Sequence, residues 1–515
     1  MSSVTTESQV TMTKDENRVD KALLAVASVV VLGTIMSILD TTVVNVAINT
    51  LSLDFHTSLT TIQWVATGYT LALATVIPLS GWIADRFGTK RLYMISIALF
   101  LAGSALSGLA WSAGSLIFFR VLQGLGGGMI MPAGMTILTR AAGPRRIGRV
   151  MSIIGVPMLL GPIIGPILGG WLVADVSWRW IFFINVPIGI VALFLAARIL
   201  PRDVPQKEQR LDLIDLFLLS PGLALVIYGL AESNSAGGFG AAKVVIPMLA
   251  GLGLLVGFVW HALRARNPLI DLRLFKNRTF ATSSAALILV AISVFGSFLL
   301  LPLYFQAVRG ESALQAGLLL APQGFGAMLA MPIAGQLADR TGSGRIVPFG
   351  LLAIIGSMLW WTQIGAGTSY VATSIDLFIF GLGMGFTMMP TFSGAMQTMR
   401  REVVARGTTS LNILQQTGAS IGTAVLSVIL ASALTSKLGS AGHGGIGGVA
   451  HLSPAVRHHI APLMAGAFGQ TFWWAVGLLG VAFVASLMLP KSTPEVAGEP
   501  AEGGAEQAQP VPLAA

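Results

Sequence analysis

The sequence predicts an all-α integral membrane protein, and three properties of its composition lead to that prediction. The chain has 515 residues, of which 54% are hydrophobic and only 10% are charged, with a mean hydropathy of +0.78. Soluble domains carry about 25% charged residues, so this chain lacks the polar surface that water requires. Its 60 glycines fit a helical bundle in which small residues let helices approach closely. Because the chain has no cysteine, disulfides, thiolate metal sites and a cysteine nucleophile are excluded.

Fourteen apolar segments are long enough to cross a bilayer, which takes about 20 residues per helix. In chain order they are roughly 22–48, 60–83, 92–111, 114–138, 150–174, 180–199, 213–232, 243–263, 280–308, 313–338, 346–364, 370–397, 406–434 and 469–489. We therefore expect fourteen transmembrane helices.

These spans divide into two six-helix lobes, which we expect over residues 21–200 and 279–490. Residues 201–278 form a linker that contains two extra spans. The N-terminal tail, 1–20, is polar, and we expect no cleavable signal peptide. The tail 491–515 is rich in Ala, Gly, Pro and Glu, and we expect it to be disordered.

The basic residues gather on one side of the predicted spans. Of the 31 Lys and Arg residues, 25 fall in the tails and loops on the side of the termini, and Arg120 lies inside a span. The remaining five lie on the opposite side, at Arg179, Lys243, Arg309, Lys437 and Arg457. By the positive-inside rule both termini are cytoplasmic. The basic residues that give the net charge of +9 then orient the chain in the membrane, next to anionic lipid. We expect no nucleic-acid partner.

The longest outer loop is predicted over residues 435–468, which are rich in glycine. Four histidines fall in it, at His443, His451, His458 and His459. Their spacing matches no known set of metal ligands. We expect a flexible polar loop and no metal site.

An internal repeat relates the two lobes. Residues 81–88, Gly-Trp-Ile-Ala-Asp-Arg-Phe-Gly, recur at 335–342 as Gly-Gln-Leu-Ala-Asp-Arg-Thr-Gly. A second echo pairs 124–132 with 381–390, each running from Gly-Leu-Gly to a proline. Both copies lie on the same side of the membrane, which indicates a parallel repeat. This pattern favours a two-lobed carrier with a cavity between its lobes over a channel or a membrane enzyme.

Several motifs carry a family resemblance. Residues 81–91 resemble the signature loop of the major facilitator superfamily, and 120–124 (Arg-Val-Leu-Gln-Gly) resemble its fourth-helix motif. Residues 161–170 (Gly-Pro-Ile-Ile-Gly-Pro-Ile-Leu-Gly-Gly) resemble the fifth-helix motif of its antiporters. Residues 39–47 (Leu-Asp-Thr-Thr-Val-Val-Asn-Val-Ala) and 178–187 (Trp-Arg-Trp-Ile-Phe-Phe-Ile-Asn-Val-Pro) resemble the fourteen-helix drug:proton antiporters of the EmrB/QacA type.

The resemblance implies the major facilitator fold and a multi-pass protein of the bacterial cytoplasmic membrane. It also implies alternating access and proton-driven export of amphipathic, often cationic, compounds. Its partners are then these substrates, protons and membrane lipid, and a periplasmic adaptor protein is a further partner to consider. No cofactor is expected, because the proton gradient supplies the energy.

Asp40 is the first candidate for proton coupling, because it is the only charged residue between Lys21 and Asp54. A charged Asp at the middle of a span costs roughly 2.5–3.5 kcal/mol on insertion scales, so it must face the bundle or a cavity. We expect Asp40 to load a proton from outside and release it to the cytoplasm. The alternative is a permanently charged Asp whose salt bridge only holds helices together.

Arg120 is the expected partner of Asp40. It lies about 30 Å of helix from Arg140, and Asp40 lies about 28 Å from Lys21, so the two share a similar depth. Arginine keeps its proton in proteins and is therefore a fixed positive charge. The second lobe has Leu377 or a neighbour at the matching place, and this asymmetry favours a functional role. The alternative is an arginine that is satisfied by backbone carbonyls.

The fifth span combines glycines at four-residue steps with prolines beside them. These residues are Pro157, Gly161, Pro162, Gly165, Pro166 and Gly169. Small residues at that period allow close backbone contact, and proline bends a helix. We expect a tightly packed, kinked helix that seals the cavity against ion leak; the alternative is general glycine-rich packing.

A gating role is expected for the charged residues of the two repeated loops. They are Asp85, Arg86, Lys90 and Arg91 in the first copy, and Asp339 and Arg340 in the weaker second copy. Asp85 would accept hydrogen bonds from a helix N-terminus, and the cations would pair with acids across the inner face. The alternative is that these charges only orient the chain.

The substrate cavity is expected to be apolar and adaptable. Candidates from spans that line the cavity in this fold are Asn45, Tyr69, Met129, Phe298, Gln306, Gln323, Phe325, Phe386, Met388 and Gln415. For each of them, packing in the core or against lipid is the alternative. The acids Asp376 and Glu232 fall near the outer surface, which leaves Asp40 as the sole deep acid.

Other functions remain as alternatives. A dedicated exporter of one metabolite, lipid or siderophore is barely separated by sequence from a multidrug exporter. The antiporter-like fifth span and the lone deep acid argue against a uniporter or importer. An ATP-driven pump or membrane enzyme is disfavoured, because neither a phosphate-binding loop nor a His-Glu-x-x-His motif occurs.

Overall fold

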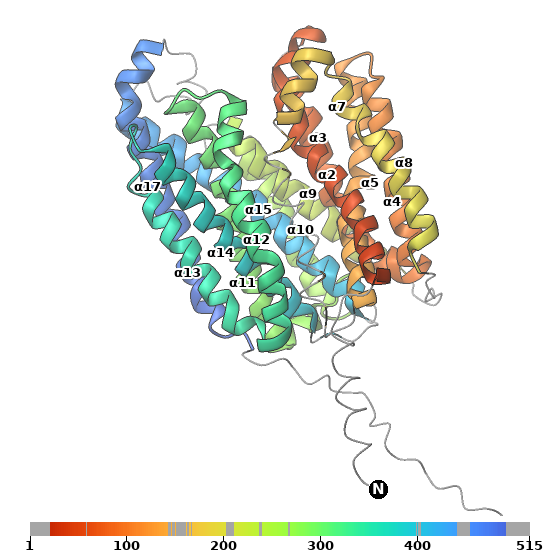
Figure 1. The fold of residues 1–515 in the computed structure, drawn as a ribbon. Helices are drawn as coiled ribbons and strands as arrows, with labels where there is room; N and C mark the ends of the chain where they lie inside the picture. Colours follow the sequence, from red (N-terminus) through yellow and green to blue (C-terminus); the bar gives the residue numbers. More distant parts are fainter. Residues whose placement is uncertain are drawn as a thin grey trace, which may run out of the picture.

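The protein, seen here in a computed structural model, consists of long helices gathered into two groups (Figure 1). The structure describes residues 21–57, 59–142, 146, 150, 161, 164–165, 167–201, 211–235, 239–265, 268–397, 399, 403–439 and 454–490. Among them, thirteen helices are long and apolar enough to cross a membrane. A shorter apolar helix over Ile167–Val176 is the described end of the fifth predicted span. Together they agree with the prediction of fourteen.

The first group of helices comes from the first half of the chain. It contains α2 (Lys21–Asp54), α3 (Leu59–Phe87), α4 (Thr89–Gly108), α5 (Ala113–Ala142), the π-helix η1 (Leu172–Val176), α7 (Trp180–Phe183) and α8 (Asn185–Ile199). The sixth predicted span is thus interrupted at Ile184. Pro187 explains the interruption, because it has no N–H to donate to the carbonyl of Phe183.

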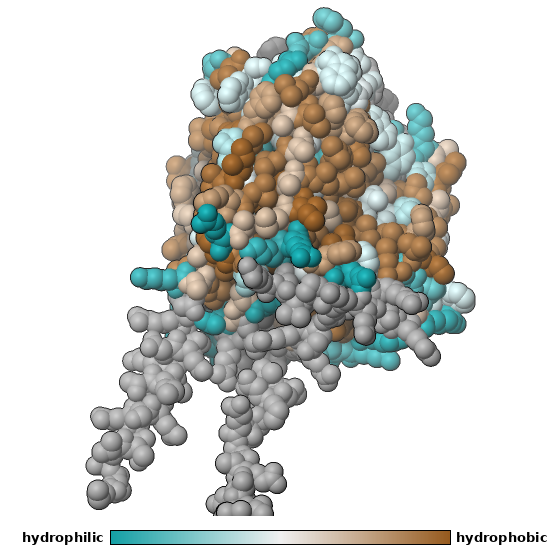
Figure 2. All heavy atoms as spheres, turned by 90° about the vertical axis from the view of Figure 1, so that its right-hand side faces the viewer, coloured by the Kyte–Doolittle hydropathy of each residue, from teal (hydrophilic) through white to brown (hydrophobic). Residues whose placement is uncertain are grey.

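The second group follows two inserted helices. The insert contains α9 (Leu213–Ser235) and α10 (Ala242–Ala262), followed by the short η2 (Leu272–Lys276). The second group contains α11 (Arg278–Ala307), α12 (Ala313–Thr341), α13 (Ser343–Trp361), α14 (Tyr370–Gln397), α15 (Val404–Leu438) and α17 (Pro454–Ser486). Large apolar side chains such as Phe217, Val256 and Phe349 are exposed along these helices. The face in Figure 2, on the side of α4 and α8, shows a broad apolar band between more polar ends, as a lipid-facing surface requires.

The last helix begins earlier than predicted. α17 starts at Pro454, so the prediction of an outer loop over 435–468 is wrong for its second half. Proline is favoured in the first turn of a helix, where its missing N–H has no partner to lose. His443 and His451 lie outside the described residues, as does the side chain of His458, and His459 is exposed on α17.

The internal repeat appears as the same joint in both halves. Gly88 separates α3 from α4 with a φ of 98°, and Gly342 separates α12 from α13 with a φ of 84°. Side chains rarely tolerate this region, so glycine is required at both positions. The helix α5 packs against α3 and α4, and α14 packs in the same way against α12 and α13.

The two groups meet at the end of the bundle that carries Lys21, Arg86 and Arg140, which we call the basic end. There α3 packs against α15, and Ser80 Oγ lies 3.1 Å from Thr409 Oγ1. The ribbons of the two groups diverge toward the opposite end (Figure 1). The inserted α9 packs against both α3 and α15, and its Leu219 shares an apolar cluster with Ile77 and Ile413. The insert therefore lies where the two lobes join.

A buried charge network and a contact between lobes

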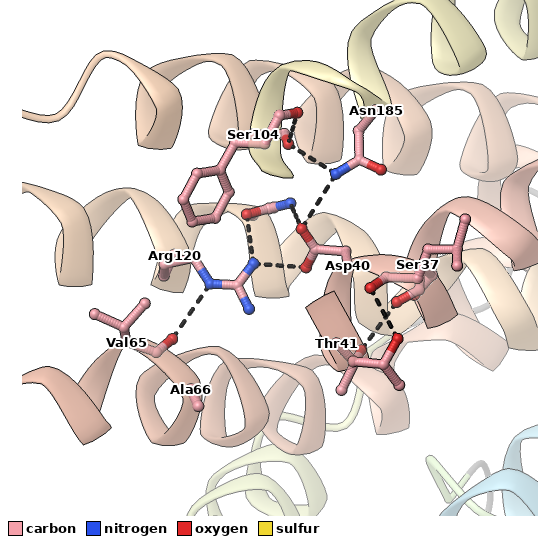
Figure 3. Close-up of polar contacts among 12 residues, drawn as sticks. Ser37, Asp40, Thr41, Val65, Ala66, Ser104, Arg120 and Asn185 are labelled. Atoms are coloured by element: carbon pink, nitrogen blue, oxygen red, sulfur yellow. Dashed lines mark hydrogen bonds and ion pairs between the residues drawn. The ribbon is translucent and has the colours of Figure 1, made fainter. Parts of the chain in front are cut away.

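A buried ion pair joins the first and fourth predicted spans. Asp40 on α2 and Arg120 on α5 are each only 1% exposed. Arg120 Nη1 donates to Asp40 Oδ2 over 2.5 Å (Figure 3). The prediction that these two residues lie together is confirmed by this contact.

Two amide side chains complete the environment of the Asp40 carboxylate. Gln123 Nε2 donates to Asp40 Oδ1 over 2.7 Å, and Asn185 Nδ2 donates to the same oxygen over 3.2 Å. The Oε1 atom of Gln123 in turn accepts from Arg120 Nη1 over 2.7 Å. Asn185 also donates to Ser104 Oγ over 3.1 Å. The carboxylate therefore accepts three hydrogen bonds from α5 and α8, which offset the cost of burying its charge.

The guanidinium of Arg120 has further partners on α3 and α7. Its Nε donates to the carbonyl of Val65 over 3.2 Å (Figure 3). The ring of Tyr69 lies 4.0 Å from the guanidinium carbon, and that of Phe182 lies 5.7 Å away. Aromatic faces attract a cation most strongly where water is excluded. Tyr69, a predicted cavity residue, is thus a buried neighbour of the ion pair.

This arrangement links charge to helix position. Removing one charge from a buried pair leaves the other uncompensated, at a cost of about 3–5 kcal/mol. Proton uptake by Asp40 would have that effect on Arg120. The hydrogen bonds of the pair come from α2, α3, α5 and α8. A change of charge here would therefore alter the packing among these four helices.

Three glycines of the fifth span pack directly on α2. Gly161 lies against Ile38, and an added Cβ at Gly165 would overlap Thr42. At Gly169 an added Cβ would approach Val43 Cγ1 to 2.9 Å. The close packing predicted for this face is therefore present on the helix that carries Asp40. The three prolines of the motif, Pro157, Pro162 and Pro166, lie outside the described residues, and the sealing role stays a prediction.

Asp85 connects the two lobes at the basic end. Its side chain is fully buried, and Arg140 Nη2 donates to its Oδ1 over 3.0 Å. Arg406 Nε, on α15 of the second lobe, lies 3.7 Å from Asp85 Oδ2. Sequence reasoning missed Arg406, because no repeat or motif marks the start of α15.

The other predicted gating residues have different surroundings. Lys90 Nζ donates to the carbonyls of Ala197 and Leu200, at the end of α8. Arg86 and Asp339 are half-buried, whereas Arg91 and Arg340 are exposed. Lys90 thus binds the carboxyl end of a helix, where a cation is favoured.

The predicted cavity residues differ widely in burial. Met129, Met388, Gln323 and Gln415 are buried, Phe298 and Phe386 are half-buried, and Gln306 and Phe325 are exposed. Gln323 Nε2 lies 3.8 Å from Met384 Sδ, and Phe298 packs edge-on against Phe380. The side chain of Asn45 lies outside the described part of the structure. The membership of these residues in one cavity stays a prediction.

Asp376 is more enclosed than the sequence indicated. It lies in the second turn of α14, near the far end of the helix as expected, but it is only 8% exposed. Ser357 Oγ, on α13, donates to Asp376 Oδ2 over 2.7 Å. The carboxyl is therefore a buried acid that is held inside the second lobe.

Gln123, Asn185 and Ser104 are site residues that sequence reasoning did not single out. Gln123 lies one turn from Arg120 on the same face of α5, and this spacing was available in the sequence. Asn185 belongs to the motif at 178–187, but nothing in the sequence indicated that its side chain reaches Asp40. Ser104 carries no sequence signal.

The long apolar helices, the repeated glycine joint and the charges buried within one lobe define a two-lobed transporter that crosses the membrane many times. The chain belongs to the Major Facilitator Superfamily, whose family model matches residues 30–423. It is 47% identical over 423 residues to the multidrug resistance protein B homolog of Mycobacterium tuberculosis (strain ATCC 25618 / H37Rv). This match covers 80% of this chain and 77% of that protein. It is 32% identical over 397 residues to the multidrug export protein EmrB of Escherichia coli (strain K12), over 76% of this chain and 77% of that protein.

Among solved structures, the fold is similar to that of the human organic anion transporter MFSD10 (TETRAN). The TM-score is 0.56 at 16% identity, over 89% of this chain and 99% of that chain. At this identity the likeness concerns the fold alone. The protein is a transporter of this superfamily, related to multidrug exporters, and not an enzyme.

Proposed function

We propose that the protein is a proton-coupled antiporter that exports amphipathic, often cationic, compounds across the bacterial cytoplasmic membrane. The observation that carries this proposal is the buried pair of Asp40 and Arg120 with its amide partners. An ionisable residue inside a span is costly, and such residues characteristically mark ion pathways. The names of the relatives, as multidrug resistance and export proteins, support a drug-like substrate.

The coupling step follows from the chemistry of the pair. A proton that reaches Asp40 from outside neutralises the carboxylate and releases Arg120 from its charged partner. The cost of an uncompensated guanidinium then favours a rearrangement of the helices around it. Loss of the proton to the cytoplasm restores the pair. Each charge moved across the membrane contributes about 2.3 kcal/mol per 100 mV toward driving this cycle.

The conformation itself is part of the proposal. The positive-inside rule places the basic end in the cytoplasm. The lobes join at that end through Ser80 and Thr409, so we assign this conformation to the outward-facing half of the cycle. In it the Asp40 side chain is fully buried, and proton exchange requires that α2 and α5 shift relative to each other.

The test uses purified protein in proteoliposomes with an imposed pH gradient and ethidium, a lipophilic cation, as the transported probe. Asp40→Asn should abolish proton-driven ethidium movement while the protein still inserts and folds. Asp376→Asn removes a buried acid of the second lobe and is the matched control, which should keep coupled transport. Undiminished transport by Asp40→Asn, or an equal loss in both variants, would contradict the role of Asp40.

A panel of fluorescent drugs and single metabolites in a pump-deficient host then separates a multidrug exporter from a dedicated one. Export of several unrelated amphipathic compounds, each stopped by an uncoupler, is the expected result. Export that persists with the uncoupler would contradict proton coupling.

A further inference from the structure

Three side chains that could bind a metal converge at the basic end of the inserted helices. Asp212 directly precedes α9, Asp215 lies in its first turn, and His261 lies in the last turn of α10. One oxygen of each carboxylate and the imidazole Nε2 lie within 4.8 Å of one another. No motif in the sequence marks this cluster, because His261 is 49 residues from Asp212 along the chain.

Both carboxylates are oriented by the backbone. Asp212 Oδ1 accepts from the N–H groups of Ile214 and Asp215, over 3.0 and 3.2 Å. Asp215 Oδ2 accepts from the N–H of Leu269 over 2.8 Å. The second oxygen of each carboxylate is thereby directed at His261 Nε2, at 3.0 Å for Asp212 and 3.9 Å for Asp215. Such backbone hydrogen bonds are what holds metal ligands in a fixed position.

One atom of the cluster lacks the partner that its burial requires. The Asp215 side chain is fully buried, yet its Oδ1 accepts no hydrogen bond from the described residues. A buried polar atom without a partner is costly and uncommon in native structures. This atom faces the imidazole and the second carboxylate, so a cation between the three groups would satisfy it.

We propose that Asp212, Asp215 and His261 form a binding site for a divalent transition-metal ion of the Zn²⁺ type. An imidazole with two carboxylates suits such an ion better than Mg²⁺ or Ca²⁺, which take oxygen ligands alone. Zinc bonds of about 2.0–2.2 Å place tetrahedral ligands about 3.4 Å apart, and the two distances from Nε2 lie on either side of that value. Three protein ligands leave a fourth position for water.

A bound ion would tie together both inserted helices and, through Leu269, the segment that leads into the second lobe. Because α9 packs against α3 and α15, the ion would stiffen the insert where the two lobes meet. The proposal does not depend on the substrate or on proton coupling.

The experiment measures Zn²⁺ binding to the purified full-length protein by equilibrium dialysis with elemental analysis. Wild type should bind one ion per chain, and His261→Gln and Asp215→Asn should each bind it at least about tenfold more weakly. Both variants are designed to fold, because the new glutamine amide keeps a donor for Asp212 and the new asparagine carbonyl keeps an acceptor for the N–H of Leu269. His459→Gln, which changes an exposed histidine on α17, is the control and should bind as wild type does.

Thermal unfolding gives a second measurement. Zn²⁺ should raise the Tm of wild type and of His459→Gln but not that of His261→Gln, because a ligand that binds only the folded state stabilises it. Equal Zn²⁺ affinity in wild type and His261→Gln would overturn the proposal and leave the cluster as an ion pair. Absence of binding to wild type would overturn it as well.

Discussion

Arg406 of α15 approaches Asp85 of α3 to 3.7 Å, so the buried carboxylate of the first signature loop faces a cation from the other lobe. Within its own lobe Asp85 also binds Arg140. This one carboxylate therefore connects the repeated motif to the surface on which the lobes meet, and its contacts must change when the lobes separate.

Replacing Asp85 by Asn should loosen the contact between the lobes, because it removes the negative charge that attracts Arg406. The chain has no cysteine, so one cysteine introduced at Thr409, on the buried contact, can report on opening. Its labelling by a maleimide should be severalfold faster with Asp85→Asn than without it. The matched change in the second copy, Asp339→Asn, should have a smaller effect. Equal labelling rates in all three proteins would show that Asp85 does not hold the lobes together.

Removing Arg120 should destabilise the protein. Arg120→Gln leaves the buried Asp40 without its cation, at a cost of about 3–5 kcal/mol in the free energy of unfolding. The double variant Asp40→Asn with Arg120→Gln should recover much of that stability, because neither charge remains. It should nevertheless fail to couple transport to a pH gradient. Thermal unfolding and proteoliposome assays together test this, and coupled transport by the stable double variant would reduce the pair to a structural salt bridge.

Tyr69 should act through its ring rather than through its hydroxyl. Tyr69→Phe keeps the face that covers Arg120 at 4.0 Å and should retain stability and transport. Tyr69→Leu loses that face, and we expect a loss of about 1–2 kcal/mol together with impaired transport. Thermal unfolding and ethidium transport are measured for both. If Tyr69→Phe is as defective as Tyr69→Leu, the hydroxyl and not the ring is what matters at this position.

Substitution by alanine should have different effects at two glycines of the fifth span. Gly165→Ala places its Cβ against Thr42, next to the turn that carries Asp40, and we expect a loss of about 1–3 kcal/mol in stability. Gly170→Ala has open space around the added carbon and should be neutral. Comparison of the two Tm values, with transport rates beside them, tests the packing. Similar values for the two variants would contradict close contact between this span and α2.

The sequence predicted much of the fold because membrane burial leaves a direct mark on it. Long apolar segments, the asymmetry of Lys and Arg and the repeated glycine motif are local signals, and the positive φ of Gly88 and Gly342 follows from the motif itself. The start of α17 was missed, because Arg457, His458 and His459, with a proline on either side, interrupt the apolar residues that precede 469.

The site was predictable only in part. Asp40 and Arg120 were found because a charge inside a span is conspicuous, and counting residues along each helix placed them at one depth. Asn185 and Arg406 were not found, because their contacts depend on how helices far apart in the chain pack together. The cluster of Asp212, Asp215 and His261 was missed for the same reason, since α9 and α10 must lie antiparallel to bring its residues together.

The position of α9 has a mechanical consequence. Its Leu219 shares one apolar cluster with Ile77 of the first lobe and Ile413 of the second. If the two lobes rotate relative to each other, α9 cannot keep its contacts with both of them. Its packing against α3 or against α15 would then have to change in each transport cycle. We therefore expect substitutions on this surface of α9 to change the rate of transport without changing the contacts of Asp40 and Arg120.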